Sequence, residues 1–329
     1  MCSLWARDLM PGVRVTATYD GVMRNTADLY SVVLTETEVP RDLPLVIGLT
    51  GFVDSGGAVA QVSGYLLDVL DHRDVLLFDN DQLLDYRARR PIMVFEETRI
   101  TEYRRPQLAL RMAHDELGTP FLLLTGYEPD FQWERFVDAL VGIIARYGVT
   151  STTWVHAIPM PVPHTRPIGV TVSGTRGDLI ESLSVWRPRT QVPGNVLHLL
   201  EFRLTESGHP IAGFVLLVPH YLADTEFPSA AVTALESITA ATSLLFPTDR
   251  LRADGREFLA KIEGQVEGNT ELARLVATLE ERHDIYMEDN PLRSPLTDED
   301  GELPSADSIA AELEKFLAFR QTADDDKAN

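Results

Sequence analysis

The sequence predicts an α/β fold: a three-layer α/β/α sandwich around a mixed sheet, with a C-terminal helical appendage. The first observation is the stretch 44–70, in which an apolar run passes through a glycine-rich turn into an amphipathic helical pattern. The second is that short apolar runs and helical periodicity keep alternating along the chain. The third is a glycine-containing connection between two apolar runs at 108–124, a hairpin signal that adds antiparallel strands.

Composition limits the partners that we expect. The chain has 329 residues, of which 44% are hydrophobic and 24% charged, as is typical of a globular protein with a buried core. Its net charge of −21 repels phosphate groups, so we expect neither nucleic acid nor a membrane surface as a partner. The single cysteine, Cys2, excludes an intrachain disulfide. With no signal-peptide pattern and no membrane-spanning apolar stretch, the sequence predicts a cytoplasmic protein.

The first half of the chain predicts mostly strands. Apolar runs predict strands at 13–15, 29–34, 45–49, 74–79, 92–95, 108–113 and 121–124, and a helix follows the glycine-rich turn up to Leu70. A second helix, with Asp130 as its N-cap, is expected to end at Gly148.

The second half continues the alternation and ends in charged helix. We expect strands at 152–158, 169–173 and 211–218, and helices beginning at Asn195, at Pro228 and over 248–283. The segment 159–167 is too rich in proline for a helix or an inner strand. The predicted division is an N-terminal segment packed on the main domain (1–43), the main α/β/α domain (44–247), a helical extension (248–289), a linker (290–304), a terminal amphipathic helix (305–320) and a disordered acidic tail (321–329).

The glycine-rich turn GFVDSGG is the first candidate site. It matches neither the phosphate-binding P-loop pattern nor the dinucleotide-binding glycine pattern. Two interpretations of Asp54 and Ser55 stay open. Either residue can cap the following helix, or the turn can present backbone N–H groups to an anionic ligand.

Other candidates lie in loops beside predicted strands. Arg90 belongs to the arginine-rich segment DYRARRP, whose guanidinium groups suit either carboxylate or phosphate ligands or structural ion pairs. His164 and Arg166 lie in the loop PHTRP, where histidine suits proton transfer and arginine suits oxyanions, although such side chains also bind backbone carbonyls. The predicted ligand crevice at the carboxyl ends of the strands comprises Asp54, Ser55, Arg90, Glu128, His164 and Arg166.

No catalytic constellation is recognised in the sequence. The nucleophile-elbow pattern fails because Val53 occupies the position where a glycine is required before Ser55. There is no HExxH motif, no pair of cysteines and no close cluster of histidine and aspartate, so we expect no metal and no cofactor. The sequence therefore favours a non-enzymatic protein without establishing it.

With these segments in place, the chain resembles the proteasome assembly chaperone 2 (PAC2) family, in particular its actinobacterial branch. The matching segments are VIGLTGFVDSGGAVA, LLDYRARRP, LLLTGYEPDFQWERF, VPHTRP and VPHYL, which keep their order. The resemblance implies a sandwich similar to the purine nucleoside phosphorylase class. It also implies a scaffold or chaperone that acts through protein contacts. Eukaryotic and archaeal assembly chaperones are associated with a C-terminal hydrophobic–tyrosine–any tail, whereas this sequence ends DDDKAN.

Two functional hypotheses follow. The leading one is a non-enzymatic scaffold or assembly chaperone that forms a homo-oligomer, with a trimer expected from the phosphorylase-type resemblance. Its partner surface would include Phe316 and Leu317 of the terminal helix, and a proteasome-related partner is implied only by the family resemblance. The alternative is a small-ligand-binding protein, or an enzyme of nucleoside phosphorylase or hydrolase type, that uses the predicted crevice.

Overall fold

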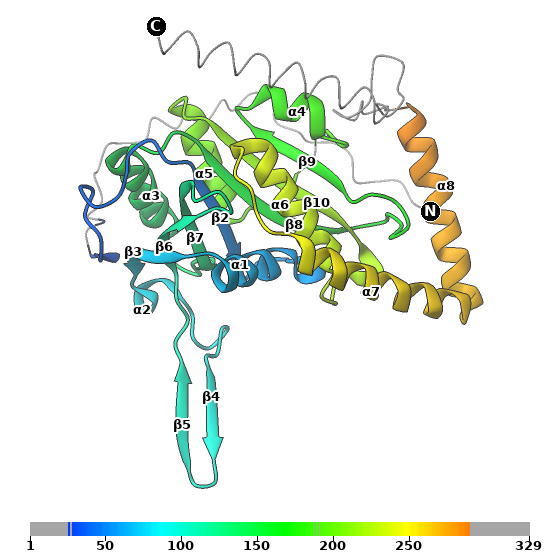
Figure 1. The fold of residues 1–329 in the computed structure, drawn as a ribbon, viewed down its shortest axis with the longest axis horizontal. Helices are drawn as coiled ribbons and strands as arrows, with labels where there is room; N and C mark the ends of the chain where they lie inside the picture. The colour runs from blue at the N-terminus through cyan, green and yellow to red at the C-terminus, as the bar shows by residue number, and fades with distance from the viewer. Residues whose placement is uncertain (1–25, 27, 188, 190, 290–329) are drawn as a thin grey trace, which may run out of the picture.

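The computed structural model describes residues 26, 28–187, 189 and 191–289, and it confirms an α/β/α sandwich with a mixed sheet (Figure 1). The strands of the large sheet are, in spatial order, β1 (Tyr30–Val32), β3 (His72–Phe78), β6 (Ala109–His114), β7 (Pro120–Tyr127), β2 (Leu45–Thr50), β8 (Thr152–Met160), β10 (Ile211–Pro219) and β9 (Gly169–Gly174). Strands β7, β2, β8 and β10 are parallel, whereas the pairings that flank them are antiparallel. The β6–β7 hairpin is the one predicted from the glycine-containing connection.

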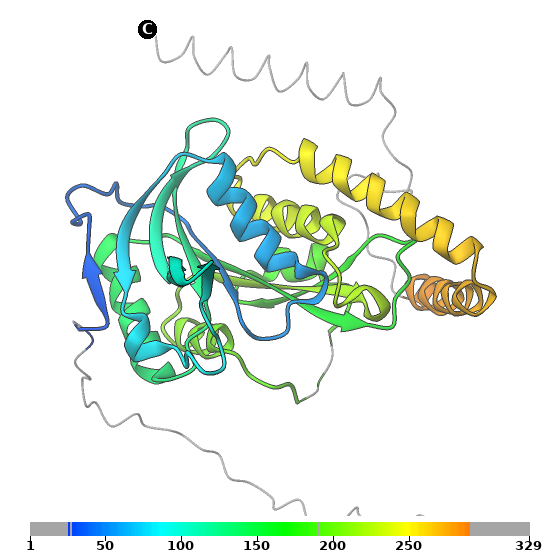
Figure 2. The same ribbon diagram turned by 90° about the horizontal axis from the view of Figure 1, so that it is seen from below.

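Helices cover both faces of the sheet (Figure 2). One face packs against α1 (Ala58–Val69) and α6 (Pro228–Thr242), and the other packs against α3 (Trp133–Tyr147) and α5 (Val196–Glu206). Two shorter helices, α2 (Asn80–Leu83) and α4 (Gly177–Leu183), lie in connections. The central strand β2 is apolar from Leu45 to Leu49, because both of its faces are buried: Ile47 faces the α3–α5 side and Val46 faces the α1–α6 side.

Three helix boundaries lie where the sequence predicts them. Asn195 caps α5, since its side-chain oxygen accepts from the backbone N–H of His198 and its own backbone N–H donates to His198 Nδ1. Pro228 is the first residue of α6, and Gly148 ends α3 in a left-handed conformation. The prediction that Asp130 caps α3 is wrong, because the N-cap is Gln132. The Asp130 carboxylate instead binds the backbone N–H of Asp85 and the guanidinium of Arg89.

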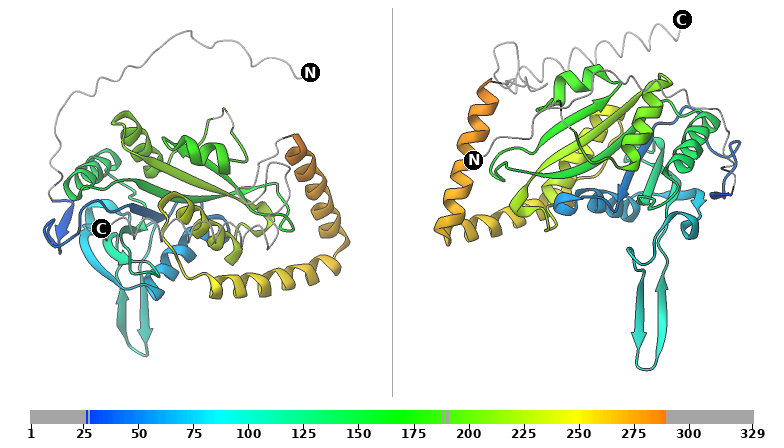
Figure 3. Two further views of the ribbon diagram at one scale, coloured as in Figure 1. Left: turned by 45° about the horizontal axis from the view of Figure 1, so that its top comes forward. Right: turned by 180° about the vertical axis from the view of Figure 1, so that it is seen from behind.

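The segment 248–289, expected as a helical extension, consists of two helices. The two helices, α7 (Asp249–Glu267) and α8 (Thr270–Asp289), meet at a sharp bend, and they form a bracket at the end of the molecule opposite α3 (Figure 3). The break falls at Gly268 and Asn269. The side-chain oxygen of Asn269 accepts hydrogen bonds from the backbone N–H groups of Glu271 and Leu272, and so begins α8.

A second, two-stranded sheet projects from the body of the molecule (Figures 1 and 3). It pairs β4 (Ile92–Glu96) with β5 (Arg99–Arg104), and we call residues 90–105 the β4–β5 arm. The strand predicted at 92–95 is confirmed. Its partner, RITEYR, was not predicted, because its polar and charged residues hide the strand pattern.

The first two residues of the proline-rich segment 159–167 form part of a strand, which differs from the expectation. Strand β8 continues through Pro159 to Met160, where it pairs with the end of β10. On its opposite edge, β8 pairs with β2 only as far as Trp154. That edge of β8 therefore has almost no strand partner at the level of Pro159. The missing N–H of proline is tolerated at such a position. The strand predicted at 13–15, the linker, the terminal helix with Phe316 and Leu317, and the acidic tail lie outside the described residues.

Candidate functional site

Asp54 follows the carboxyl end of β2 and binds the N-terminus of α1, although the N-cap residue of that helix is Gly57. Its two carboxylate oxygens accept hydrogen bonds of 2.9 Å from the backbone N–H groups of Val59 and Ala60, in the first turn of α1. Burial raises the pKa of Asp54 despite these bonds. Ser55 is buried beside it, and its hydroxyl oxygen has no hydrogen-bond partner in the part of the chain that the structure describes. The capping interpretation therefore accounts for Asp54.

Glu128 follows the carboxyl end of β7 and joins that strand to α5. Its Oε1 accepts a 2.7 Å hydrogen bond from the backbone N–H of Val196, the first residue of α5. Glu128 is buried, and desolvation raises its pKa. The carboxylate thus stabilises a helix N-terminus that the fold brings close to the sheet edge.

Of the three neighbouring arginines, Arg89 rather than Arg90 lies at the sheet edge. The Arg89 guanidinium pairs with Asp130 at 2.9 Å and donates to the carbonyl oxygen of Gly51 at 3.1 Å. Gly51 has φ +114°, and a Cβ there would collide with this guanidinium. Arg90 is exposed at the base of the β4–β5 arm, so it does not join Asp54 or Glu128.

His164 is buried in the loop after β8 and is held by Tyr221, which follows β10. The backbone N–H of His164 donates to the Tyr221 hydroxyl at 2.8 Å, and His164 Nδ1 lies 2.7 Å from the same oxygen. Burial lowers the pKa of His164.

Arg166, two residues later, connects this loop to the helical extension. Its guanidinium pairs with Asp284 at 2.7 Å and with Glu280 at 3.2 Å, both on α8. Thr165 also donates its hydroxyl proton to Glu280. These contacts fasten α8 to a loop more than a hundred residues earlier in the chain, and they neutralise Arg166.

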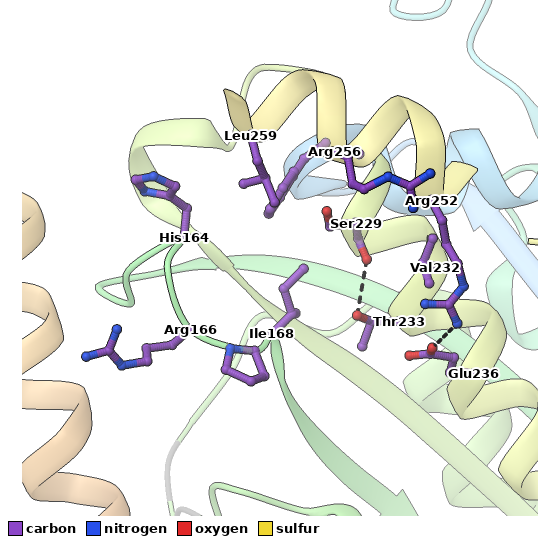
Figure 4. A pocket seen from close by; sticks show the side chains of 13 residues that line it. His164, Arg166, Ile168, Ser229, Val232, Thr233, Glu236, Arg252, Arg256 and Leu259 are labelled. Carbon is purple, nitrogen blue, oxygen red and sulfur yellow. Dashed lines mark hydrogen bonds and ion pairs between the residues drawn. The ribbon is translucent and has the colours of Figure 1, made fainter. Parts of the chain in front are cut away.

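His164 and Arg166 line a cavity that the other four predicted residues do not reach. Its volume is about 430 Å³, and it lies between the 164–168 loop, α6 and α7 (Figure 4). The six predicted residues are therefore distributed over separate places. Asp54 and Glu128 cap different helices, Ser55 is buried next to Asp54, Arg90 is at the arm, and His164 and Arg166 form one wall of the cavity.

His156 is one of the buried titratable residues that the sequence reasoning missed. His156 lies in β8 and stacks on Phe52, with 5.4 Å between ring centroids. Desolvation, and secondarily the proximity of His198, lower the pKa of His156 to about 4. Its Nε2 has no hydrogen-bond partner among the described residues. A histidine inside an apolar strand run was the signal available in the sequence.

The described part of the chain contains no group of three or more histidine, cysteine, aspartate or glutamate side chains arranged to hold a metal ion. Within the same residues, no helix has the length and apolar character needed to cross a membrane.

Comparison with known proteins identifies the family of this chain. The model of the PAC2 family matches residues 48–266. The chain belongs to the PAC2 family. The match begins in β2 and ends in α7, so it includes the sheet edge, the β4–β5 arm and the cavity.

Solved structures agree with the PAC2 assignment. A Corynebacterium glutamicum protein of unknown function is 35% identical, with a TM-score of 0.77 over 80% of this chain and 99% of that chain. A Mycobacterium tuberculosis protein of unknown function is 37% identical, with a TM-score of 0.75 over 86% of this chain and 95% of that chain. A proteasome-assembly chaperone homologue from M. tuberculosis shares the fold at 21% identity and a TM-score of 0.65, over 71% of this chain and all of that chain. The search of curated proteins gave no match.

Proposed function

We propose that this PAC2 protein is a cytoplasmic, non-enzymatic scaffold or assembly factor, and that the β4–β5 arm makes its main protein contact. Family membership supports a chaperone-like protein in general terms. The observation that carries the proposal is the apolar face of the arm.

The register of the arm collects large apolar side chains on one face. Met93 lies opposite Tyr103, and Phe95 lies opposite Ile100, because a register shift after Val94 brings Ile100 into line. Cross-strand partners share a face and alternate along the strand, so these four side chains form one stripe. They are between 52% and 65% exposed.

The opposite face of the arm is polar in character. There Val94 pairs with Glu102, Glu96 with Arg99, and Ile92 with Arg104. An isolated two-stranded hairpin is marginally stable in water, and exposed apolar patches of this kind mark contact surfaces. Complete burial of one such large apolar side chain by a partner stabilises the complex by roughly 1.5–3 kcal/mol. We therefore expect a protein partner to cover the apolar face of the arm.

The occupant that we propose is a second copy of this chain. Within the arm the exposed charged side chains are four arginines and three glutamates, whereas the whole chain carries a net charge of −21. The arm is thus locally basic and complements the acidic surface of another copy. The expected product is a homo-oligomer, with a trimer as the expected size from the phosphorylase-type fold.

The test compares two faces of the same arm. We expect light scattering after size exclusion to show an oligomer for the wild type and a smaller species for the double variant Phe95→Ser/Ile100→Ser. Ile92→Ser, on the polar face and equally exposed, serves as the control and should keep the wild-type mass. A wild-type monomer at micromolar concentration, or an oligomer unaffected by the double variant, would overturn the proposal.

A proteasome-related client is a narrower proposal that rests on the structural neighbours, which include a proteasome-assembly chaperone homologue. Its test is co-elution of the full chain with purified proteasome core particles. Loss of co-elution in Phe95→Ser/Ile100→Ser but not in Ile92→Ser would assign the client to the arm. Absence of co-elution with the wild type would remove the proteasome from the proposal and leave the scaffold role intact.

A further inference from the structure

We propose that the cavity between the 164–168 loop, α6 and α7 binds a small organic monoanion with an apolar body, of which an aliphatic monocarboxylate is the simplest representative. This inference is independent of the arm and of the scaffold role.

The walls of the cavity supply the apolar part of the site. Ile168 comes from the loop, Val232 from α6 and Leu259 from α7, and their side chains converge on the space in Figure 4. A volume of about 430 Å³ lies within the range of small-molecule pockets, which are mostly apolar with a few placed polar groups. The cavity is thus large enough for a short aliphatic chain, and its walls favour one.

The charged side chains around the cavity favour a ligand that carries a single negative charge. Three arginines line it, and two of them are already neutralised: Arg166 by Glu280 and Asp284, and Arg252 by Glu236 at 2.5 Å. The third, Arg256, is exposed and has no hydrogen-bond or ion-pair partner within the described residues. One free guanidinium matches one carboxylate through paired N–H donors. A dianion would leave a second charge uncompensated near several carboxylates.

The start of α6 adds polar groups beside Arg256. Ser229 lies in the first turn of α6 and lines the cavity, and its hydroxyl is not engaged as a hydrogen-bond donor by any described residue. Gly255 of α7 faces it, and a Cβ on Gly255 would lie 3.0 Å from Ser229 Oγ and 3.5 Å from Ser229 N. The absence of a side chain at Gly255, which is buried, therefore lets α7 pack closely against the start of α6. The positive end of the helix dipole favours a carboxylate there.

The far wall is rigid. His164 is fixed through two contacts to Tyr221, and Arg166 fastens the same loop to α8. The site is therefore assembled from the loop, α6 and α7, with α8 holding the loop in place. A ligand that fills it stabilises the packing of the helical extension on the body.

The test is a thermal-shift and calorimetric titration of the full chain with acetate, hexanoate, octanoate, 1-octanol, octyl phosphate and inorganic phosphate. Octanoate, used below its micelle concentration, should raise Tm more than hexanoate, and acetate should have little effect because it lacks the apolar body. Octanol and octyl phosphate should bind more weakly than octanoate, because one lacks the charge and the other carries an excess of it.

Variants separate this site from non-specific binding. Arg256→Gln should weaken octanoate binding roughly tenfold or more, because it removes a charged hydrogen-bond donor. Lys261→Gln removes an exposed cation from the same helix outside the cavity and should bind like the wild type. Phe95→Ser/Ile100→Ser removes the apolar face of the arm and should also bind normally.

Three results would overturn the proposal. They are no shift with any of the carboxylates, an octanoate affinity unchanged in Arg256→Gln, and an affinity for octanol or inorganic phosphate equal to that for octanoate. Because Arg256 is exposed and unpaired within the described residues, its replacement is not expected to unfold the chain, and far-UV circular dichroism of the variant checks this.

Discussion

The carboxyl edge of the central strands and the β4–β5 arm use their side chains in opposite ways. At the sheet edge, Asp54, Glu128 and Arg89 are largely withdrawn from solvent and each is bound to a neighbouring element. On the arm, Phe95 and Ile100 are exposed to solvent, and none of the described helices and strands covers them. The edge therefore stabilises the fold, whereas the arm contributes a surface.

The largest expected effect at the sheet edge is a dependence of stability on pH. His156 has a folded-state pKa of about 4, below its ordinary value of 6.5, so the unfolded chain binds a proton more readily than the native chain. The stability that His156 contributes is present above pH 6.5 and is lost as the pH falls from 6.5 towards 4, by up to about 3 kcal/mol. Urea unfolding across this range should show a shallower loss in His156→Asn than in the wild type. The exposed His220→Asn should follow the wild-type curve.

The next largest effect on stability concerns the hydrogen bond from the start of α5 to Glu128, which follows β7. Glu128→Ala leaves the Val196 N–H without its acceptor in a buried place, and should lower the free energy of unfolding by about 1–3 kcal/mol. Glu128→Gln keeps an acceptor oxygen and avoids burying a charge, so it should be nearly neutral at pH 7. Chemical denaturation measures both variants. Equal losses in the two would contradict the assigned hydrogen bond.

A smaller effect is expected at the cap of α1. Asp54→Ala removes the acceptor for two N–H groups and should cost about 1 kcal/mol, while Asp54→Asn keeps one acceptor oxygen and should cost less. If both variants were as stable as the wild type, the cap would be replaced by water, and Asp54 would be available for another role.

The smallest effect on stability should come from the arm. Phe95→Ser/Ile100→Ser replaces exposed side chains and should change the free energy of unfolding of the monomer by no more than about 0.5 kcal/mol. The same variant should have the largest effect on oligomer mass. A large loss of monomer stability would show that the arm packs against its own chain, which would remove the contrast between the two regions.

The sequence predicted the elements whose signals are local. The apolar run of β2, the hairpin of β6 and β7, the cap at Asn195 and Pro228 at the start of α6 depend on neighbouring residues and were found. The assignment of Asp130 as a cap was wrong because Arg89, 41 residues earlier, binds its carboxylate. Local propensity gives no information about such a competitor.

The candidate site was less accessible to sequence reasoning for the same reason. His164 and Arg166 were singled out, but their partners Tyr221, Glu280 and Asp284 are 57 to 118 residues away. The cavity depends on α7 and α6 lying against that loop, and no periodic pattern specifies this contact. The arm was missed because β5 is polar and because exposure, which makes it conspicuous, has no sequence signature.

The position of β2 at the centre of the sheet bears on how the chain reaches this structure. Leu45 pairs with Leu122 on one side and with Thr152 on the other, so both neighbours of this apolar strand are synthesised long after it. Contacts between residues so far apart in the sequence slow folding. Until they form, the apolar strand stays exposed and prone to aggregation. A ribosome-bound chain that has not yet reached β8 would therefore expose one edge of this apolar strand, which makes this interval of synthesis the one most open to misassembly.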